Sequence, residues 1–335
     1  MQTGIRPTGM RIKKSETNSL IPVILGTAVF IVLFFISLFA SKNGISFSLE
    51  TKASLIILYK IRFPRTIACV VSGAALSVAG FILQSALNNV LASPGIIGVN
   101  SGSGFFVLLA SLLFPYASLV RSLAAFTGAV TAIIIVYLIS EKSGVSKTTL
   151  VLAGVAVSSL MTAGIDVLIT MHPEIVADKV SFSLGGFQNV SLPSLKIAVP
   201  VITVSIVAVY AISGGIDLFQ LGDETAHSLG LNVRLCRIST IVLAGVLAGS
   251  AVSVSGLLGF VGLIVPNLTR LGSVRGIKTN ITMCLIFGAD FLLFCDILAR
   301  LLFYPYEVPV GLFLSCLGST FFIWMLVRKK RRLSV

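Results

Sequence analysis

The side chains that could do chemistry in this chain are a few ionisable residues inside apolar segments. Asp166 and Asp290 have no evident partner nearby in the sequence, whereas Asp296 and Arg300 are four residues apart and can pair on one face of a helix. A charge at the centre of a membrane costs about 2.5–3.5 kcal/mol on insertion scales, so such residues mark a polar pathway or a buried ion pair. Asp166 and Asp290 could each line a pathway or pair with a cation elsewhere in the chain.

The other reactive residue types do not form a recognisable catalytic or metal-binding pattern. The five cysteines are scattered without a C-x-x-C motif, and His172 and His227 are the only histidines. The sequence contains no H-E-x-x-H motif and no nucleophile–base set, so we expect no metal site, no active site and no cofactor in this chain. It also contains no G-x-x-x-x-G-K-[ST] motif, so an ATPase acting with it must be a separate polypeptide.

Composition indicates an all-α integral membrane protein. Mean hydropathy is +1.04, with 56% of the 335 residues apolar and only 11% charged. A helix needs roughly 20 apolar residues to cross a bilayer core of about 30 Å. The sequence predicts ten spans in a single transmembrane domain of residues 1–335. They are residues 20–40, 66–87, 96–114, 119–139, 150–171, 195–212, 238–254, 257–271, 281–302 and 310–327.

The charged ends of the chain predict its orientation. Arg6, Arg11, Lys13 and Lys14 lie in the tail of residues 1–19, and five consecutive basic residues begin the tail of residues 328–335. Basic segments stay in the cytoplasm, so both ends are expected there, which requires an even number of spans. The sequence thus predicts a multi-pass protein of the cytoplasmic (inner) membrane. Basic tails beside anionic lipid explain the net charge of +13 without nucleic acid.

Two of the predicted spans carry similar local sequences. S-G-A-A-L-S-V-A-G at residues 72–80 resembles A-G-S-A-V-S-V-S-G at residues 248–256, and each copy is followed by a proline, Pro94 or Pro266. The copies lie five spans apart, so they cross the membrane in opposite directions. Inverted repeats are typical of transporters, which open alternately to the two sides of the membrane. We therefore predict an inverted repeat that relates spans 2–5 to spans 7–10.

A stripe of small residues on the second span leads into a polar segment. Gly73, Ser77, Gly80 and Gln84 share one helical face, which allows another helix to approach closely and directs Gln84 toward protein or water. The polar residues beyond the stripe could serve packing or line a pathway. The pathway candidates, with the two isolated acids, are Gln84, Asn88, Asn89, Pro94, Asn100, Ser101, Asp166, Pro266, Asn267 and Asp290.

A basic cluster follows the first span, on the side where the positive-inside rule does not expect it. Its members include Lys52, Lys60, Arg62 and Arg65. One interpretation is a collar whose long side chains reach the lipid headgroups. The other is a docking surface for an acidic partner, because arginine pairs with carboxylates in a bidentate manner.

The order of these segments resembles the permeases of the iron-siderophore and cobalamin ABC importers, the type II importers. The resemblance covers nearly everything after residue 55. It is carried by R-x-P-R-T at 62–66, G-A-A-L at 73–76, N-V-L-A-S-P-G at 89–95, L-A-G-V-A at 152–156, L-G-D-E-T-A at 221–226, G-F-V-G-L-I-V-P at 259–266, D-I-L-A-R at 296–300 and E-V-P-V-G at 307–311. Two positions depart from the family pattern, because Val90 replaces a proline and Asn267 replaces a histidine.

The resemblance implies roles for two groups of residues and the type II importer permease fold. It implies that Arg62, Arg65 and Arg300 contact acidic residues of an extracytoplasmic binding protein. Within the cytoplasmic loop 214–234, the pattern of residues 221–230 predicts a short helix with acids in its first turn and a glycine at its end. The resemblance implies that this is the coupling helix that contacts the ATPase, through Gly222, Asp223, Glu224, Ala226, Leu229 and Gly230.

The sequence therefore predicts the permease subunit of an ATP-driven importer for an iron chelate, with a ferric siderophore as the expected cargo. The resemblance implies two permease subunits, identical or similar, with two ATPase subunits that bind ATP and Mg²⁺ and one binding protein. Haem and cobalamin are the alternative cargoes. An ion-coupled secondary transporter that uses Asp166 and Asp290 is the alternative of another class, and a non-transporting membrane scaffold is disfavoured by the repeat. The coupling-helix sequence favours the importer, because a secondary transporter has no ATPase to contact.

Overall fold

The computed structural model describes residues 13–41, 44–45, 52–143, 146–188, 190, 192–271, 276–302 and 306–333. Apolar runs form its long helices, seven of which have the length and composition to cross a membrane. These seven are α1 (Lys13–Phe39), α3 (Phe63–Leu87), α5 (Ser118–Lys142), α6 (Lys147–Met171), α8 (Leu192–Ala211), α11 (Val233–Ser255) and α13 (Ile277–Leu301).

Three further helices occupy the remaining predicted spans. They are α4 (Val99–Leu113), α12 (Val261–Leu271) and α14 (Val310–Leu333). α12 has only 11 residues and contains Pro266, and α4 has 15 residues. Each of the ten predicted spans therefore coincides with a helix, as expected for the all-α fold, but α4 and α12 are too short to cross a bilayer core of about 30 Å unaided.

Short elements connect the long helices. The helical ones are α2 (Lys52–Ile57), η2 (Leu58–Arg62), η3 (Pro94–Ile97), η4 (Pro173–Ile175), α7 (Val176–Leu184), α9 (Ser213–Leu218), η5 (Phe219–Leu221) and α10 (Asp223–Ser228). α2, η2 and α3 follow one another without a break in the helical backbone. The second span therefore begins at Ser54, earlier than the predicted start at residue 66. Two strands of two residues, β1 (Ala40–Ser41) and β2 (Gly44–Ile45), pair antiparallel with Ala40 opposite Ile45.

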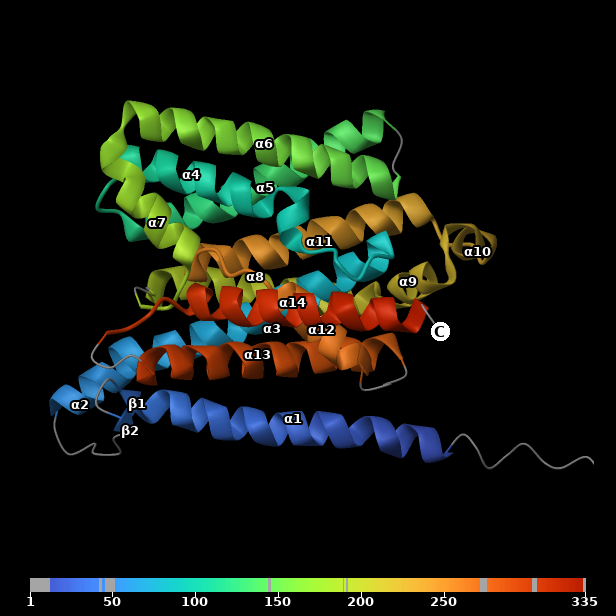
Figure 1. The fold of residues 1–335 in the computed structure, drawn as a ribbon, viewed down its shortest axis with the longest axis horizontal. Coiled ribbons are helices and arrows are strands. Elements are labelled where there is room, and N and C mark those ends of the chain that lie inside the picture. Colours follow the sequence, from blue (N-terminus) through green and yellow to red (C-terminus); the bar gives the residue numbers. More distant parts are fainter. Residues whose placement is uncertain are drawn as a thin grey trace, which may run out of the picture.

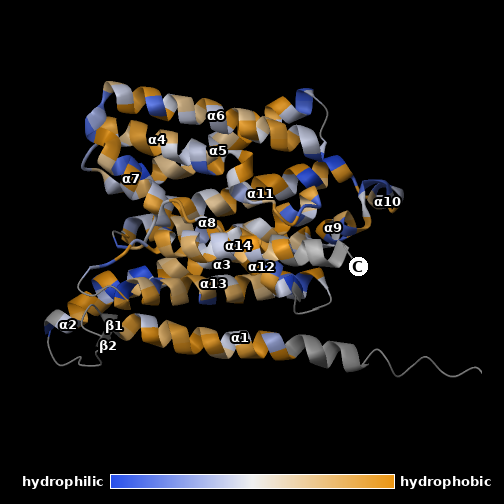
Figure 2. Cartoon of the chain, in the orientation of Figure 1, coloured by the Kyte–Doolittle hydropathy of each residue, from blue (hydrophilic) through white to orange (hydrophobic). Residues whose placement is uncertain are grey.

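The long helices lie side by side, with α6 at one edge of the bundle and α1 at the opposite edge (Figure 1). α10 lies at one end of the bundle, where α1 begins and α14 ends (Figure 1). α2, the two strands and α7 lie at the other end (Figure 1). Hydrophobic residues cover the lengths of the helices and hydrophilic residues gather toward the two ends (Figure 2), which is the distribution that a bilayer requires.

The packing of α3 and α11 reflects the predicted repeat. α3 runs toward the end that carries α10, and α11 runs away from it (Figure 1). α3 packs on α13 and α11 packs on α5, so each copy of the repeated sequence contacts the other half of the chain. The small residues make these contacts, because Gly73 faces the backbone of Gly288 and Gly249 faces Ala129. Farther along α3, a Cβ atom at Gly80 would overlap the backbone of Gly262 on α12.

Candidate functional site

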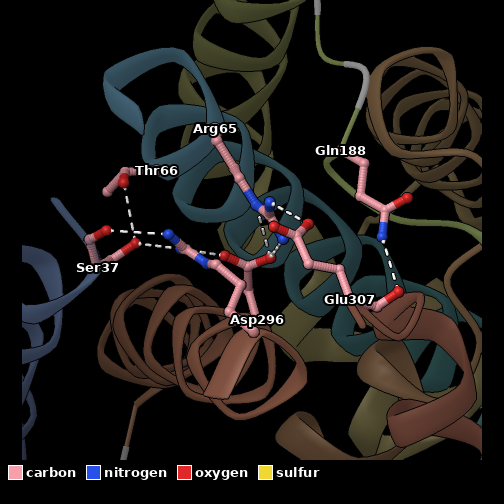
Figure 3. A network of polar contacts seen from close by, with 7 residues as sticks. Ser37, Arg65, Thr66, Gln188, Asp296 and Glu307 are labelled. Atoms are coloured by element: carbon pink, nitrogen blue, oxygen red, sulfur yellow. Dashed lines mark hydrogen bonds and ion pairs between the residues drawn. The ribbon is translucent and has the colours of Figure 1, made fainter. Parts of the chain in front are cut away.

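A buried network of charges joins α1, α3 and α13 near the end of the bundle that carries α2 (Figures 1 and 3). Arg65 lies in the first turn of α3 and is 7% exposed, and Asp296 on α13 is 0% exposed. Arg65 donates from Nε and Nη2 to Asp296 Oδ1 at 3.1 and 2.9 Å, and its Nη1 is 3.0 Å from Glu307 Oε2. Asp296 is thus the centre of the network, because Arg65 satisfies one of its oxygens and Arg300 the other.

Arg300 extends this network to α1. Its Nη2 donates to Asp296 Oδ2, so the ion pair predicted between these two residues is formed. The same guanidinium donates to the backbone oxygen of Ser37 at 3.1 Å and to Ser37 Oγ at 2.8 Å, and Ser37 Oγ is 2.9 Å from Thr66 Oγ1. Two arginines and two carboxylates therefore share one buried site, which leaves it without net charge.

The three arginines predicted to dock a partner do not share one environment. Arg65 and Arg300 are buried in the network. Arg62 is partly exposed in η2 and donates to the backbone oxygen of Leu38 at 3.4 Å, and Lys52 and Lys60 beside it are exposed. In this structure only Arg62 of the three reaches the surface, and the docking role of all three stays a prediction.

The predicted short helix at the opposite end is formed as α10. Asp223 and Glu224 lie in its first turn, and it is bounded by Gly222 and Gly230, which have φ of 95° and 85°. These left-handed values explain the glycines, because other residues adopt them at a cost. Ala226 in the middle of α10 is fully buried, and its N–H donates to Gly222 O at 3.0 Å.

Asp223 connects α10 to two long helices. Its Oδ1 is 2.7 Å from Arg237 Nη2, near the start of α11, and 3.3 Å from Lys147 Nζ, the first residue of α6. Burial alone would raise the pKa of the Asp223 carboxyl, but Arg237 and Lys147 outweigh it and hold that pKa below its ordinary value. Arg237 is 3% exposed, with its guanidinium 5.5 Å from the centre of the Phe219 ring. The carboxylate of Asp223 therefore serves contacts within this chain.

Three leucines around α10 are exposed. Leu221, Leu229 and Leu235 are 58%, 60% and 62% exposed. The first two flank α10, which projects from the end of the bundle (Figure 1). Apolar side chains in such a place favour contact with another protein or with lipid.

The polar residues that follow α3 lie around a hollow of about 400 Å³ at the same end of the molecule. Gln84 is 1% exposed and donates from Nε2 to Gly262 O at 3.1 Å, so this amide faces α12, inside the protein. Asn88 ends α3 in the left-handed conformation with φ of 48°, and Asn89 Oδ1 accepts from Leu91 N at 3.0 Å. The structure thus brings together three pathway candidates that the sequence placed after one stripe. Residues from elsewhere complete the lining, which consists of Phe81, Gln84, Ser85, Asn88, Asn89, Val90, Gln220, Arg270 and Asn280.

The next pathway candidates lie around η3 and α12. Pro94 is buried as the first residue of η3, and Ser101 Oγ donates to Gly98 O at 3.2 Å; Asn100, beside it at the start of α4, is half-buried. Pro266 is buried within α12. Asn267 Nδ2 donates to Leu263 O at 2.8 Å and to Val90 O at 3.2 Å, so it ties α12 to the loop after α3. The two positions that depart from the family pattern, Val90 and Asn267, therefore contact each other.

Asp166 belongs to an exposed polar face of α6 that sequence reasoning missed. Ser158, Thr162, Asp166 and Thr170 recur at intervals of four, a spacing that places them on one helical face. Asp166 Oδ1 is 3.6 Å from Lys179 Nζ on α7, a long-range pairing that no local pattern indicates. A hollow of about 490 Å³ follows this face and is lined by Gly95, Ile96, Val155, Ser158, Ser159, Thr162, Ala163 and Asp166.

Asp290 lies in different surroundings, on α13. It is 6% exposed, and neither carboxylate oxygen has a hydrogen-bond partner among the described residues. It borders an apolar crevice of about 510 Å³ between α1, α12 and α13. α6 and α13 lie far apart across the bundle (Figure 1), so Asp166 and Asp290 do not form one site.

A further hollow of about 720 Å³, also missed from the sequence, lies beside α7. Side chains of α4, α5, α7, α8 and α11 line it, many of them serines, and Arg121 and Asp178 pair across it at 3.3 Å between Nη1 and Oδ1. The backbone holds α7 against its neighbours, because Gly186 N donates to Ser255 O at 2.7 Å and Leu257 N donates to Phe182 O at 2.9 Å.

Comparison with known proteins gives consistent matches over nearly the whole chain. Residues 25–328 match the model of the FecCD transport family. The Fe(3+)-citrate import system permease protein YfmD of Bacillus subtilis is 31% identical, over 96% of this chain and 98% of its own length. The hemin transport system permease protein HmuU of Yersinia pestis is 34% identical, over 83% of this chain and 85% of its own.

Two further matches are a permease for another cargo and a solved structure. The vitamin B12 import system permease protein BtuC of Photorhabdus laumondii is 30% identical, over 90% of this chain and 91% of its own length. A solved structure assigned to a metal-chelate type ABC transporter, in an inward-facing conformation, superposes with a TM-score of 0.83 at 25% identity. That match covers 91% of this chain and 98% of the solved one.

Proposed function

The chain belongs to the FecCD transport family, and from this membership we propose that it carries a ferric siderophore as the permease subunit of an ATP-driven importer. The relatives that it matches include permeases of import systems for Fe(3+)-citrate, hemin and vitamin B12. The permease role follows from the family, and the siderophore is the part that we propose. The ATP-driven mechanism is supported by α10. This short helix projects from one end of the bundle and has exposed leucines around it.

We assign the end that carries α10 to the cytoplasm. The positive-inside rule supports this orientation, because α1 begins and α14 ends there, beside the basic tails (Figure 1). The charged network and Arg62 then lie at the extracytoplasmic ends of their helices, on the side where a binding protein would dock. In this proposal ATP and Mg²⁺ bind to two separate ATPase subunits.

A second permease subunit would complete the pathway. α6 carries Ser158, Thr162 and Asp166 on an exposed face, although its length and composition suit a membrane span. Polar side chains on such a helix face protein or water in preference to lipid. The hollow beside this face supports a water-filled path between two permease subunits, with α6 lining it.

The contacts of Asp223 suggest how movement reaches this path. A partner that displaces α10 would also displace Asp223, whose carboxylate pairs with Lys147 at the first residue of α6 and with Arg237 on α11. Conformational changes of the ATPase would thus be transmitted to the start of α6, the helix that lines the path, and to α11, through the two ion pairs of Asp223.

Haem is the second candidate cargo, because a relative with 34% identity is a hemin transport permease. The cargo is tested by uptake of radioactive iron as ferric siderophores, ferric citrate or haem, in cells that depend on this permease. Uptake of haem alone would replace the siderophore assignment and leave the permease role intact.

The energy source is tested in proteoliposomes that contain the permease and its ATPase. Ala226→Pro removes the N–H that bonds to Gly222 O, so it should abolish uptake and weaken co-purification of the ATPase. Ser228→Ala, which alters an exposed side chain of the same helix, is the control and should retain both. Uptake that continues without ATP and stops when the ion gradient collapses would identify a secondary transporter instead.

A further inference from the structure

The hollow of about 400 Å³ that begins at Gln84 is built from four separate parts of the chain. The end of α3 and its following loop supply Asn88 and Asn89, η5 supplies Gln220, α12 supplies Arg270 and α13 supplies Asn280. Residues nearly 200 positions apart in sequence are thus gathered at one place. Their side chains are of one kind, because all five end in a carboxamide or a guanidinium and none of the lining residues is acidic.

The charge in this hollow is not balanced by the described part of the chain. Arg270 forms no ion pair with any described residue, in contrast to Arg65, Arg237 and Arg300. Its guanidinium carbon lies 5.7 Å from the centre of the Phe81 ring, which fixes the cation without neutralising it. Arginine binds planar and tetrahedral oxyanions through paired N–H groups. A guanidinium that has no ion-pair partner among the described residues and lines a hollow therefore favours binding of an oxyanion there.

The neighbouring amides can supply further donors. Neither Asn88 nor Gln220 has a side-chain hydrogen bond to a described residue. Asn89 uses its Oδ1 to accept from Leu91 N, which leaves its NH₂ group to donate elsewhere. The side chains of Asn88, Asn89, Gln220 and Arg270 are exposed, so their donors, which come from three separate parts of the chain, are accessible to the acceptor oxygens of a phosphate group.

We propose that this hollow is a binding site for a phosphate group, held by Arg270 and by the amides of Asn88, Asn89 and Gln220. By the orientation given above, the site faces the cytoplasm and the inner leaflet. Free inorganic phosphate and the headgroup of an anionic phospholipid share the chemistry that the site recognises. The inference goes beyond the transport function, because binding at this site needs neither cargo nor ATPase.

Binding is tested on the full-length chain purified in a maltoside detergent, which contains no phosphate. Its thermal unfolding is followed as sodium phosphate is added, with sodium chloride at equal ionic strength as the reference. A ligand that binds only the folded state stabilises it by RT ln(1 + [L]/Kd), so the unfolding temperature rises once the phosphate concentration exceeds the Kd. In the wild-type chain the rise should follow this relation with a single Kd.

Two variants remove donors from the site with little change to the fold. Arg270→Gln should weaken phosphate binding about tenfold or more, because it removes the charge that assists the hydrogen bonds. Asn88→Gly should weaken it about threefold, since glycine accommodates the φ of 48° while the amide is lost. Lys278→Gln is the control, because Lys278 is exposed on the first turn of α13 and does not line the hollow. It should leave the affinity unchanged.

The source of the phosphate group is distinguished in a second arm. The delipidated chain is mixed with phosphatidylglycerol micelles, and retained lipid is counted by native mass spectrometry. Retention that depends on Arg270, without an effect of free phosphate, supports the site and assigns it to a lipid headgroup. A rise of the unfolding temperature with free phosphate that depends on Arg270 supports it as a soluble-anion site. No effect of phosphate beyond the chloride reference together with no retained lipid, or equal binding by wild type and Arg270→Gln, overturns the proposal.

Discussion

Arg65 and Asp296, which are 231 residues apart in sequence, join α3 to α13 through two hydrogen bonds to a single carboxylate oxygen, at 3.1 and 2.9 Å. Asp296 is fully buried and Arg65 nearly so. Removing two charges from water is costly, and the cost is offset only where good geometry and further hydrogen bonds satisfy both groups. Glu307, Arg300 and Ser37 supply those further contacts here. The network therefore holds α1, α3 and α13 together at the end of the bundle that carries α2.

The first prediction is that Asp296→Asn destabilises the chain. The variant leaves Arg65 and Arg300 close together and buried, with Glu307 as the one of the two carboxylates of the network that remains. Breaking a buried pair in this way typically costs about 3–5 kcal/mol. Thermal unfolding in detergent and the amount of protein in the membrane measure the effect.

Asp178→Asn is the matched control for this change. Asp178 pairs with Arg121 at 3.3 Å, but these side chains are 39% and 33% exposed. Exposed pairs contribute about 0–1 kcal/mol, so this variant should unfold close to the wild-type temperature. Equal losses of unfolding temperature for the two substitutions would show that the buried network does not stabilise the chain more than an exposed ion pair does.

The second prediction concerns docking of the binding protein. Arg65 and Arg300 cannot be reversed without breaking the network, so a loss of uptake in such variants would not separate docking from folding. Arg62 is partly exposed, and Arg62→Glu should lower the affinity for the binding protein and slow uptake at normal expression. Binding measured at several salt concentrations checks this, because screening weakens contacts between exposed charges.

Lys196→Glu gives the comparison for Arg62→Glu. Lys196 is exposed at the start of α8, outside the basic cluster. It makes the same change in net charge and should leave the affinity for the binding protein nearly unchanged. If Arg62→Glu binds as tightly as the wild type, the basic cluster has another role, such as the collar at the lipid headgroups.

The sequence was most informative where the physical signal is local. Apolar length predicted ten helices, the spacing of Asp296 and Arg300 predicted their pair, and acids before a glycine predicted α10. It was least informative where partners are distant. The network around Arg65 and the pairing of Asp166 with Lys179 depend on which helices become neighbours, and no local pattern contains that information. The small-residue stripe predicted a close approach on α3 without identifying α13 and α12 as the helices that approach.

The third prediction tests that close approach. A Cβ atom at Gly288 would overlap the backbone carbonyl of Gly73, so Gly288→Ala should force α13 away from α3. Overpacking of this kind typically costs about 1–3 kcal/mol. Gly214→Ala is the control, because nothing lies within 4 Å of the added methyl group. Thermal unfolding of both variants should show a loss for Gly288→Ala and none for Gly214→Ala.

The last prediction is that Asp290→Asn keeps or raises the stability of the chain and preserves ATP-driven uptake. Asp290 is 6% exposed, and neither of its oxygens has a hydrogen-bond partner among the described residues. An isolated buried carboxylate is costly, and asparagine removes the charge while keeping the shape. The contrast with Asp296→Asn is direct, because both changes neutralise a buried acid on α13 but only Asp296 is shown with ion-pair partners.

The measurements are thermal unfolding and uptake in proteoliposomes with ATP. A variant that folds normally but loses uptake would show that Asp290 serves transport, as a pathway residue or as the ion carrier of a secondary transporter. Collapse of the proton and sodium gradients, with ATP present, would then separate these two roles.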